Sequence, residues 1–510
     1  MKFPRSAGVL LHPTSLPGPY GIGDLGPEAL RFISYLHQAG IRIWQVLPLN
    51  PTGYGDSPYQ SLSAFAGNPL LINLNALVDQ GLLDASATQS RPNFPADRVD
   101  FSLVIPWKFE LLRQAATNFF ALANGEQKAE FDHFIAENCV WLDDYALFMA
   151  AKDAHQGRVW TAWDPDLALR RPSALAAWRG KLSAEISSYK FWQFIFFRQW
   201  NEIRAHCAQL GIRIMGDIPI YAAHDSADVW AHPDMFWLDD KGNPLKISGV
   251  PPDYFSATGQ LWGNPIYRWD VLKSSDYHWW IERVRASLNM FDMVRLDHFR
   301  GFEAYWEIPA GDLTAENGKW IKGPGADLFH TLTKALGPLP IVAENLGVIT
   351  PEVEGIRKQF GYPGMAILQF AFSTDPQAPT FRPHNYEQQL VAYTGGHDND
   401  TMFGWWRSGI SQSTRSQADV AKEYADAQNY FGVSAEQLDR EVNWIFIREV
   451  MKSVADTVLF PMQDVLGLGS EARMNTPGTL GGNWTWRLSP DGLRTQDQQR
   501  LKLFADIYQR

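Results

Sequence analysis

Residues 293–297 read Met-Val-Arg-Leu-Asp, a short apolar and β-prone run that ends in an acidic side chain. Seven further runs have the same apolar character, at 43–49, 70–74, 212–217, 341–344, 365–370, 390–393 and 457–460. Short apolar runs separated by helical or irregular stretches are typical of buried parallel strands in an α/β fold. Eight such runs predict a (β/α)₈ barrel, whose reacting residues lie where the strands end, at the C-terminal rim.

Uneven spacing of the runs predicts insertions on this barrel. The gap at about 75–211 contains helix-like sequence at 107–123 and 128–152, so we expect an inserted, largely helical subdomain there. A second gap, at about 222–290, predicts an inserted rim segment with a covering loop at 249–265. Since no linker or repeat divides the chain, residues 1–510 are predicted to form one catalytic barrel unit.

Charge and cysteine content exclude several classes of function. The net charge of -11 over 510 residues argues against a nucleic-acid partner, which requires a clustered basic surface, and favours a neutral or cationic ligand. The two cysteines, Cys139 and Cys207, are too few for a disulfide framework and are typical of a reducing compartment. Without an apolar leader or a run of membrane-spanning length, the sequence predicts a cytoplasmic protein with no membrane partner.

Aromatic content is high, with 21 Trp and 17 Tyr, many in segments rich in Gly, Pro and Asp. Aromatic rings in loops form flat surfaces on which sugar rings stack, but they also seal irregular cores. Taken alone, composition favours core packing, because buried aromatic residues are the commoner case.

Arg295 and Asp297 lie at the end of the predicted fourth strand. Alternation along the strand places them on one face, where the guanidinium favours the ionised carboxylate and fixes its rotamer. An ionised, oriented aspartate is what attack on an anomeric carbon requires. The alternative is a plain structural ion pair, which an isolated Arg-Leu-Asp would favour.

Glu344 follows the apolar run 341–343 and precedes Asn345. Partial burial at a strand end raises the pKa of a glutamate, which keeps it protonated long enough to act as a general acid. For this residue alone, a buried glutamate that caps a neighbouring helix is an equally good interpretation.

Residues 395–401 read Gly-Gly-His-Asp-Asn-Asp-Thr and follow the predicted seventh strand. No second His or Cys is spaced to complete a metal site with His397, so we predict neither a metal nor another cofactor. Instead, Asp398 is expected to hold hydroxyls of a distorted sugar ring, with His397 and Asn399 hydrogen bonding beside it. Two carboxylates on adjacent strands, about 5–5.5 Å apart, with a third opposite, are what retaining glycosyl transfer needs.

The loop at 249–265 is rich in Gly, Pro and aromatic residues, the composition of a lid. Tyr254, Phe255 and Trp262 are expected to cover a glucan and exclude water, which would favour a sugar hydroxyl as the attacking group. The alternative is a rigid surface loop that seals the barrel.

With these motifs in place, the chain resembles the 4-α-glucanotransferases, or amylomaltases and disproportionating enzymes, of the α-amylase clan. The resemblance runs from near Arg5 to near Arg487. It is carried by residues 11–21 (Leu-His-Pro-Thr-Ser-Leu-Pro-Gly-Pro-Tyr-Gly) and by the motifs at 53–60, 216–220, 251–265, 295–302, 343–347, 397–401 and 470–475.

The resemblance implies a (β/α)₈ barrel with inserted subdomains that lacks the C-terminal β-sandwich of α-amylases, and it implies no cofactor. By motif match, Asp297 is the nucleophile, Glu344 the acid/base and Asp398 the transition-state stabiliser. The implied substrate-binding residues are Tyr59, Asp217, Asp253, Tyr254, Phe255, Gln260, Trp262, Arg295, His298, His397 and Asn399. Two positions depart from the usual family pattern: Asn345 replaces Asp, which should make Glu344 easier to ionise and lower the pH optimum, and Gly396 replaces Thr.

The expected reaction moves an α-1,4-glucan segment from a glucan or maltooligosaccharide donor to the 4-hydroxyl of glucose or a maltooligosaccharide, through a covalent glycosyl-enzyme. Cyclic glucans are a further expected product, and starch and glycogen metabolism the expected setting. Two alternatives remain open: a hydrolase on the same barrel and a non-catalytic glucan-binding protein. The presence of Asp297, Glu344 and Asp398 argues against the last.

Overall fold

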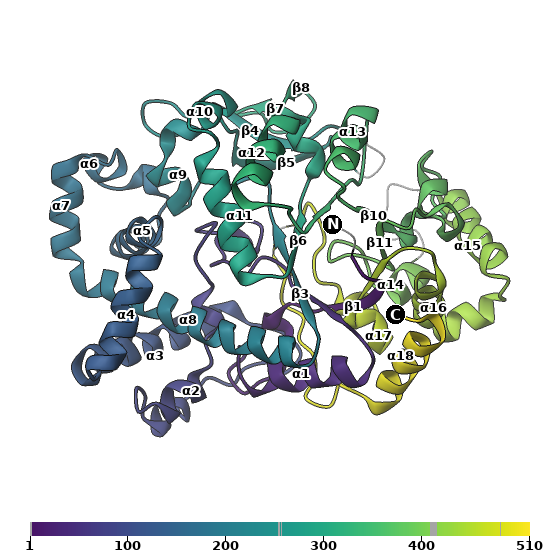
Figure 1. Ribbon diagram of the computed structural model, residues 1–510, viewed down its shortest axis with the longest axis horizontal. Coiled ribbons are helices and arrows are strands. Elements are labelled where there is room, and N and C mark those ends of the chain that lie inside the picture. The colour runs from purple at the N-terminus through teal and green to yellow at the C-terminus, as the bar shows by residue number, and fades with distance from the viewer. Residues whose placement is uncertain (1–2, 253–255, 257, 409–415, 480) are drawn as a thin grey trace.

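Eight parallel strands form the centre of the computed structural model, which describes residues 3–252, 256, 258–408, 416–479 and 481–510 (Figure 1). They are β1 (Ser6–Leu10), β2 (Ile43–Gln45), β3 (Arg213–Ile218), β6 (Met293–Leu296), β9 (Ile341–Ala343), β10 (Gly364–Ile367), β11 (Leu390–Tyr393) and β12 (Thr457–Pro461). Their order is β10-β11-β12-β1-β2-β3-β6-β9. The first and last strands of this order, β10 and β9, also meet: the N–H of Ala343, in β9, donates to the carbonyl of Pro363, just before β10, at 2.9 Å. The predicted (β/α)₈ barrel is confirmed.

One predicted strand is wrong and one strand was missed. Residues 70–74 form a 3₁₀ turn and the start of a helix, because Pro69 begins the turn and the Asn68 side chain accepts a hydrogen bond from the Leu70 N–H. The missed strand, β1, is rich in small residues and lacks the usual β-prone signal. Gly8 is required in it, since a Cβ there would lie 2.3 Å from the Leu459 side chain.

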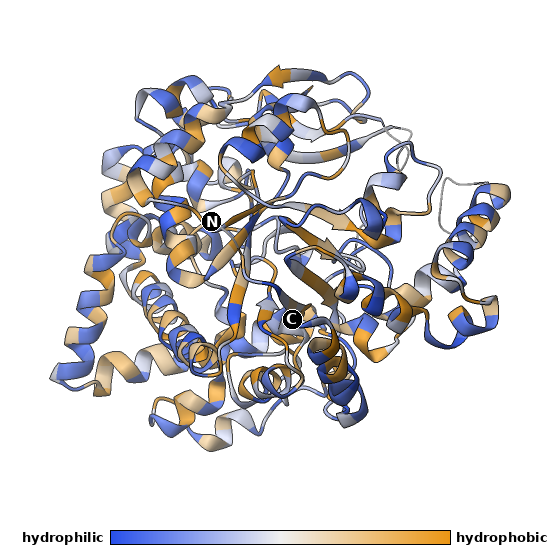
Figure 2. Ribbon diagram, turned by 45° about the vertical axis from the view of Figure 1, so that its right-hand side comes forward, coloured by the Kyte–Doolittle hydropathy of each residue, from blue (hydrophilic) through white to orange (hydrophobic). Residues whose placement is uncertain are grey.

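Helices cover the outside of the barrel, and apolar side chains fill it. The covering helices are α1 (Pro27–Gln38), α8 (Ser183–Gln209), α11 (His278–Met290), α12 (Ala326–Leu336), α13 (Pro351–Gln359), α16 (Ala435–Lys452) and α18 (Thr495–Tyr508). Inward-facing residues such as Ile43, Met215, Met293 and Leu459 pack together inside the ring. Figure 2 shows the strands as a hydrophobic centre surrounded by helices with mixed faces.

The stretch between β2 and β3 is largely helical. It contains α2 (Leu74–Asp79), α3 (Phe101–Leu122), α4 (Gly125–Glu137), α5 (Leu142–Ala154), α6 (Pro165–Ala168) and α7 (Pro172–Lys181). The helix-like stretch 128–152 is two helices, since α4 ends at Glu137 and α5 begins at Leu142. The division of the chain into a barrel and subdomains stays a prediction.

A second sheet lies beside the rim and was not predicted. It is antiparallel, in the order β5-β4-β7-β8, with β4 (Lys246–Val250), β5 (Gln260–Pro265), β7 (Ala304–Pro309) and β8 (Lys319–Lys322). The same rim carries α9 (Ala227–Ala231) and α10 (Trp269–Ser274). The sheet therefore combines segments from before and after β6. It also corrects the prediction that 249–265 is entirely a loop: residues 249–250 end β4 and 260–265 form β5, because their backbones pair, with Gly249 opposite Leu261 and Val250 opposite Gln260.

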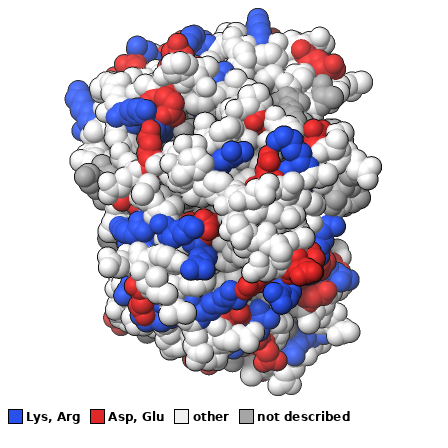
Figure 3. Space-filling model, turned by 90° about the vertical axis from the view of Figure 1, so that its right-hand side faces the viewer, with Lys and Arg blue, Asp and Glu red and all other residues white. Residues whose placement is uncertain are grey.

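The remaining helices follow the last two barrel strands. α14 (Met402–Arg407) and α15 (Gln417–Phe431) come after β11, and α17 (Met462–Leu466) comes after β12. None of the helices in the described ranges has the length and apolarity that crossing a bilayer requires. Basic and acidic side chains are interspersed on the face seen in Figure 3.

Candidate active site

Strand register brings the first group of predicted residues together. Asp217 on β3 lies directly opposite Arg295 on β6. The Arg295 Nη1 atom is 2.8 Å from Asp217 Oδ2 and also 2.8 Å from Asp297 Oδ1. The Asp217 side chain is fully buried, whereas that of Asp297 is 26% exposed and therefore accessible to a ligand. Arg295 thus orients Asp297 through one carboxylate oxygen, and the Asp297 side chain remains partly exposed.

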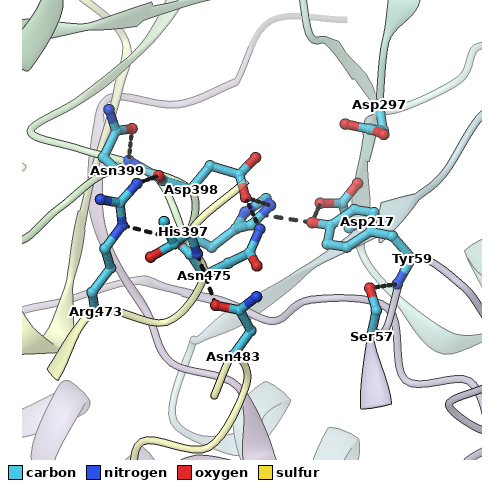
Figure 4. A network of polar contacts seen from close by, with 12 residues as sticks. Ser57, Tyr59, Asp217, Asp297, His397, Asp398, Asn399, Arg473, Asn475 and Asn483 are labelled. Carbon is cyan, nitrogen blue, oxygen red and sulfur yellow. Dashed lines mark hydrogen bonds and ion pairs between the residues drawn. The ribbon is translucent and has the colours of Figure 1, made fainter. Parts of the chain in front are cut away.

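Tyr59 links this group to the loop after β11 (Figure 4). Its hydroxyl donates to Asp217 Oδ2 at 2.8 Å and lies 3.4 Å from His397 Nδ1, and its ring stacks on the His397 ring at 4.9 Å. His397 Nε2 is 3.4 Å from Asp398 Oδ1. The fold therefore places Tyr59, one of the implied substrate-binding residues, between Asp217 and His397.

Glu344 lies at the end of β9, next to the strand that carries Asp297. It is buried, and its two carboxylate oxygens accept hydrogen bonds from the His298 N–H at 2.8 Å and the Leu346 N–H at 2.9 Å. Burial, aided by the charge of Asp297, raises the pKa of Glu344 to about 7, although the Arg295 charge and both backbone hydrogen bonds oppose this rise. Near neutral pH, Glu344 can therefore both release and accept a proton.

His298 has a left-handed backbone conformation, with φ of 48°, which aims its N–H at Glu344. Burial lowers the pKa of its imidazole to about 4, so the ring is neutral at physiological pH. Its Nε2 atom is buried and has no hydrogen-bond partner within the described ranges. The Trp262 and His298 rings pack edge to face, with their centroids 4.8 Å apart. Trp262 Nε1 in turn donates to Gln260 Oε1 at 3.3 Å. A hydroxyl group of a ligand would satisfy His298.

Two residues that received no predicted role hold Asp398. Asn475 Nδ2 donates to Asp398 Oδ1 at 2.6 Å, and Arg473 Nη2 donates to the Asp398 carbonyl at 2.6 Å (Figure 4). Both lie in the motif at 470–475, which carried the family resemblance but contained no recognisable chemistry. Only the fold brings this segment to the loop after β11.

The electrostatic state of this loop is set by the neighbouring pair His397 and Asp398. Loss of bulk water around Asp398 favours the neutral acid, but the His397 charge and the Asn475 hydrogen bond outweigh it and lower the pKa of Asp398 to about 2. Burial opposes protonation of His397, but the Asp398 carboxylate outweighs burial and raises its pKa. Asp398 is therefore an ionised carboxylate, and its side chain is 51% exposed.

Asn399 uses its side chain within the loop. Its Oδ1 atom accepts from the Gly396 N–H and its Nδ2 atom donates to Gln369 Oε1, both at 2.8 Å. The structure thus gives Asn399 a part in holding the turn, and sugar binding by this residue stays a prediction. The predicted covering residues Asp253, Tyr254 and Phe255 lie outside the described residues.

The departure at Asn345 has a structural partner. Its Oδ1 atom accepts from the Met365 N–H at 2.7 Å, and its Nδ2 atom donates to Glu354 Oε1 at 2.8 Å. Glu354 is also paired with Arg357, at 2.7 Å. Asn345 therefore joins β9, β10 and α13 near the point where the barrel closes. The proposed effect on the pH optimum stays a prediction.

We expect Asn345→Asp to destabilise the fold by about 1–3 kcal/mol, because it would replace the donor to Glu354 by a second carboxylate oxygen. Chemical denaturation measures the decrease in the free energy of unfolding. Addition of Glu354→Gln, which restores a donor, should recover part of it, and the double-mutant cycle isolates this contact. Equal losses in the presence and absence of Glu354→Gln would contradict the assignment.

A (β/α)₈ barrel with acidic side chains gathered at the C-terminal rim defines an enzyme of the barrel class. A family model described as 4-alpha-glucanotransferase matches residues 11–494. The 4-alpha-glucanotransferase of Thermus thermophilus is 50% identical over 512 residues, 100% of both chains, and that of Synechocystis sp. is 49% identical over 99% of this chain and 98% of its own. The solved amylomaltase from Streptococcus agalactiae in complex with acarbose matches with a TM-score of 0.93 and 38% identity, over 99% of each chain.

The chain belongs to the 4-alpha-glucanotransferase family, glycoside hydrolase family 77. The family resemblance of the sequence motifs and the transferase class are thereby confirmed.

Proposed function

We propose that the protein moves α-1,4-glucan segments to the 4-hydroxyl of glucose or a maltooligosaccharide by a retaining double displacement. The observation that carries this mechanism is the arrangement of Asp297 and Glu344 at the ends of adjacent strands, with the His298 N–H donating to Glu344 between them. An oriented carboxylate beside a protonatable one is the pair that retaining glycosyl transfer requires.

In the first step, an Asp297 carboxylate oxygen forms a bond to the anomeric carbon as the glycosidic bond breaks. The leaving 4-oxygen takes the proton from Glu344, whose pKa of about 7 leaves it largely protonated at slightly acid pH. In the second step, the acceptor 4-hydroxyl attacks the anomeric carbon, gives its proton to Glu344 and releases Asp297.

The other rim residues are proposed to bind the donor sugar. Asp398 is ionised and half-exposed, which suits hydrogen bonding to ring hydroxyls in the transition state. Among the described residues, a ring nitrogen of His298 has no partner, and the Trp262 ring lies beside it in an edge-to-face contact. The Tyr59 hydroxyl donates to Asp217 and its ring stacks on His397, so Tyr59 holds these two groups in position.

Product analysis with maltotriose tests the function. Transfer releases glucose and builds longer maltooligosaccharides together, so the total number of reducing ends stays constant. A hydrolase would release glucose and maltose while the number of reducing ends rises. A non-catalytic binding protein would leave maltotriose unchanged.

We expect incubation with EDTA to leave the transfer rate unchanged, because His397 and Asp398 are proposed to bind sugar. The described residues contain no group of three His, Cys, Asp or Glu side chains placed to hold a metal ion. Initial rates with and without the chelator provide the measurement. A loss that calcium, magnesium or zinc restores would overturn the proposal.

The setting of the enzyme is inferred from composition and family. Both cysteines are free, Cys207 being buried and Cys139 exposed, as in a reducing compartment. We infer a cytoplasmic enzyme of starch or glycogen metabolism.

A further inference from the structure

A second cavity lies between α5, α9 and α11, lined by residues that play no part in the candidate active site. Its volume is about 160 Å³, close to that of an engineered cavity that binds benzene, and its lining includes the exposed residues Val140 and His278. Aromatic side chains form much of its wall: Phe65, Trp141, Tyr145 and Trp279. The Phe65 ring is stacked with Trp141 at 6.3 Å and meets Trp279 edge-on at 5.9 Å.

The carboxylates in the wall already have partners. Asp144 Oδ1 lies 2.9 Å from Arg170 Nη2, Glu282 pairs with Arg285, and Asp228 Oδ2 accepts from the Ala64 N–H at 2.7 Å. The lining residues include no Lys or Arg in the described part of the chain. An anionic ligand would therefore meet carboxylates and no basic side chain of the lining. Arg170 and Arg285 neutralise Asp144 and Glu282, which removes the attraction for a cationic ligand, but the remaining lone pairs of these carboxylates can still accept hydrogen bonds from hydroxyl groups. The wall suits a neutral ligand with an apolar face and hydroxyl groups.

We propose that this cavity is an accessory binding site for one glucosyl ring of a maltooligosaccharide. The aromatic rings would contact the faces of the sugar, and the oxygens of Asp144 and Glu282, with the imidazole of His278, would bind its hydroxyls. The choice of a glucan as ligand rests on the proposed function. The cavity itself does not.

One short segment joins the two sites. Tyr59 contacts Asp217 in the active site, while Ser63 and Phe65 line the cavity. Between them, the Leu62 carbonyl accepts from the Ala227 N–H at 2.9 Å, which fixes the segment on α9. Residues 59–65 therefore connect the proposed accessory site to the active site.

Two blocking variants test the site. Val140 is 58% exposed and lines the cavity at its surface, and His278 is also exposed and lines it from α11. We expect Val140→Arg and His278→Trp each to remove one maltose-binding site per chain. Equilibrium dialysis with labelled maltose, in the Asp297→Asn background that is expected not to turn over, gives the stoichiometry.

Val454→Arg is the matched control, because Val454 is 56% exposed and does not line the cavity. It should leave the stoichiometry unchanged. Undiminished maltose binding in both blocking variants would overturn the proposal, as would an equal loss in the control. Turnover of maltotriose by the otherwise wild-type protein is measured in parallel. Loss of one maltose site without any turnover would refute the proposed function and leave the accessory site standing.

Discussion

Asp297→Asn should lower the rate of maltotriose disproportionation by roughly 10⁴-fold or more, the scale expected when a residue that forms a covalent intermediate is removed. The amide has nearly the shape of the carboxylate but is a poor nucleophile. The fold should persist, because Arg295 keeps its contact with Asp217 at 2.8 Å and the Asp297 side chain is already 26% exposed. Transfer rates and thermal unfolding provide the two measurements.

The donor maltosyl fluoride sharpens this test. Fluoride leaves without needing a proton, so a defect in acid catalysis is bypassed while a missing nucleophile is not. Asp297→Asn should therefore be inactive with both donors. Asp240→Asn, at an exposed position, is the matched control and should behave as the wild type. Retention of more than a few per cent of turnover by Asp297→Asn would disprove the assignment of the nucleophile.

The sequence predicted the parts of the site that depend on local geometry. Alternation along one strand correctly placed Arg295 and Asp297 on the same face, as their 2.8 Å contact shows. Burial at a strand end raised the pKa of Glu344 as expected. Both effects act over a few residues and need only the identity of the strand.

Contacts set by register and by long connections could not be predicted in this way. Asp217 faces Arg295 across 78 residues, and Asn475 reaches Asp398 across 77 residues. Neither pairing follows from spacing until the order of the strands is known. The same limit explains the antiparallel sheet at the rim, in which β4 pairs with β7 from the other side of β6.

Strand prediction failed at two places, where side-chain character and backbone conformation do not correspond. In β1, Gly8 meets Leu459 and Ile43 so closely that a larger residue would clash, and the run loses its apolar signal. At 70–74 the four apolar residues are buried, as in a strand, but their backbone turns. Burial and strand conformation are separate properties, and hydropathy reports only the first.

Glu344→Gln should reduce maltotriose disproportionation by about 10²–10⁴-fold, because glutamine cannot protonate the leaving oxygen. In the wild type, the acid must carry its proton. Burial, with the charge of Asp297, raises the pKa of Glu344 to about 7. Activity governed by this group is therefore fully present at lower pH and is lost as the pH rises through 7. The pH profile of kcat/KM, which reports the ionisation of the unliganded enzyme, measures this limb, and the limb should be absent from the residual activity of the variant.

The response of Glu344→Gln to maltosyl fluoride separates the acid from the nucleophile. Asp297 should still displace fluoride, but the acceptor hydroxyl then lacks the base that takes its proton, so the maltosyl-enzyme should accumulate. Mass spectrometry of the intact protein should detect this intermediate as a gain of one maltosyl group in Glu344→Gln. The Asp297→Asn variant should show no such gain. Glu352→Gln, exposed on the nearby helix α13, is the matched control. If Glu344→Gln is slowed equally with both donors and forms no covalent adduct, the buried glutamate only positions the His298 and Leu346 backbone, and the acid must be another group.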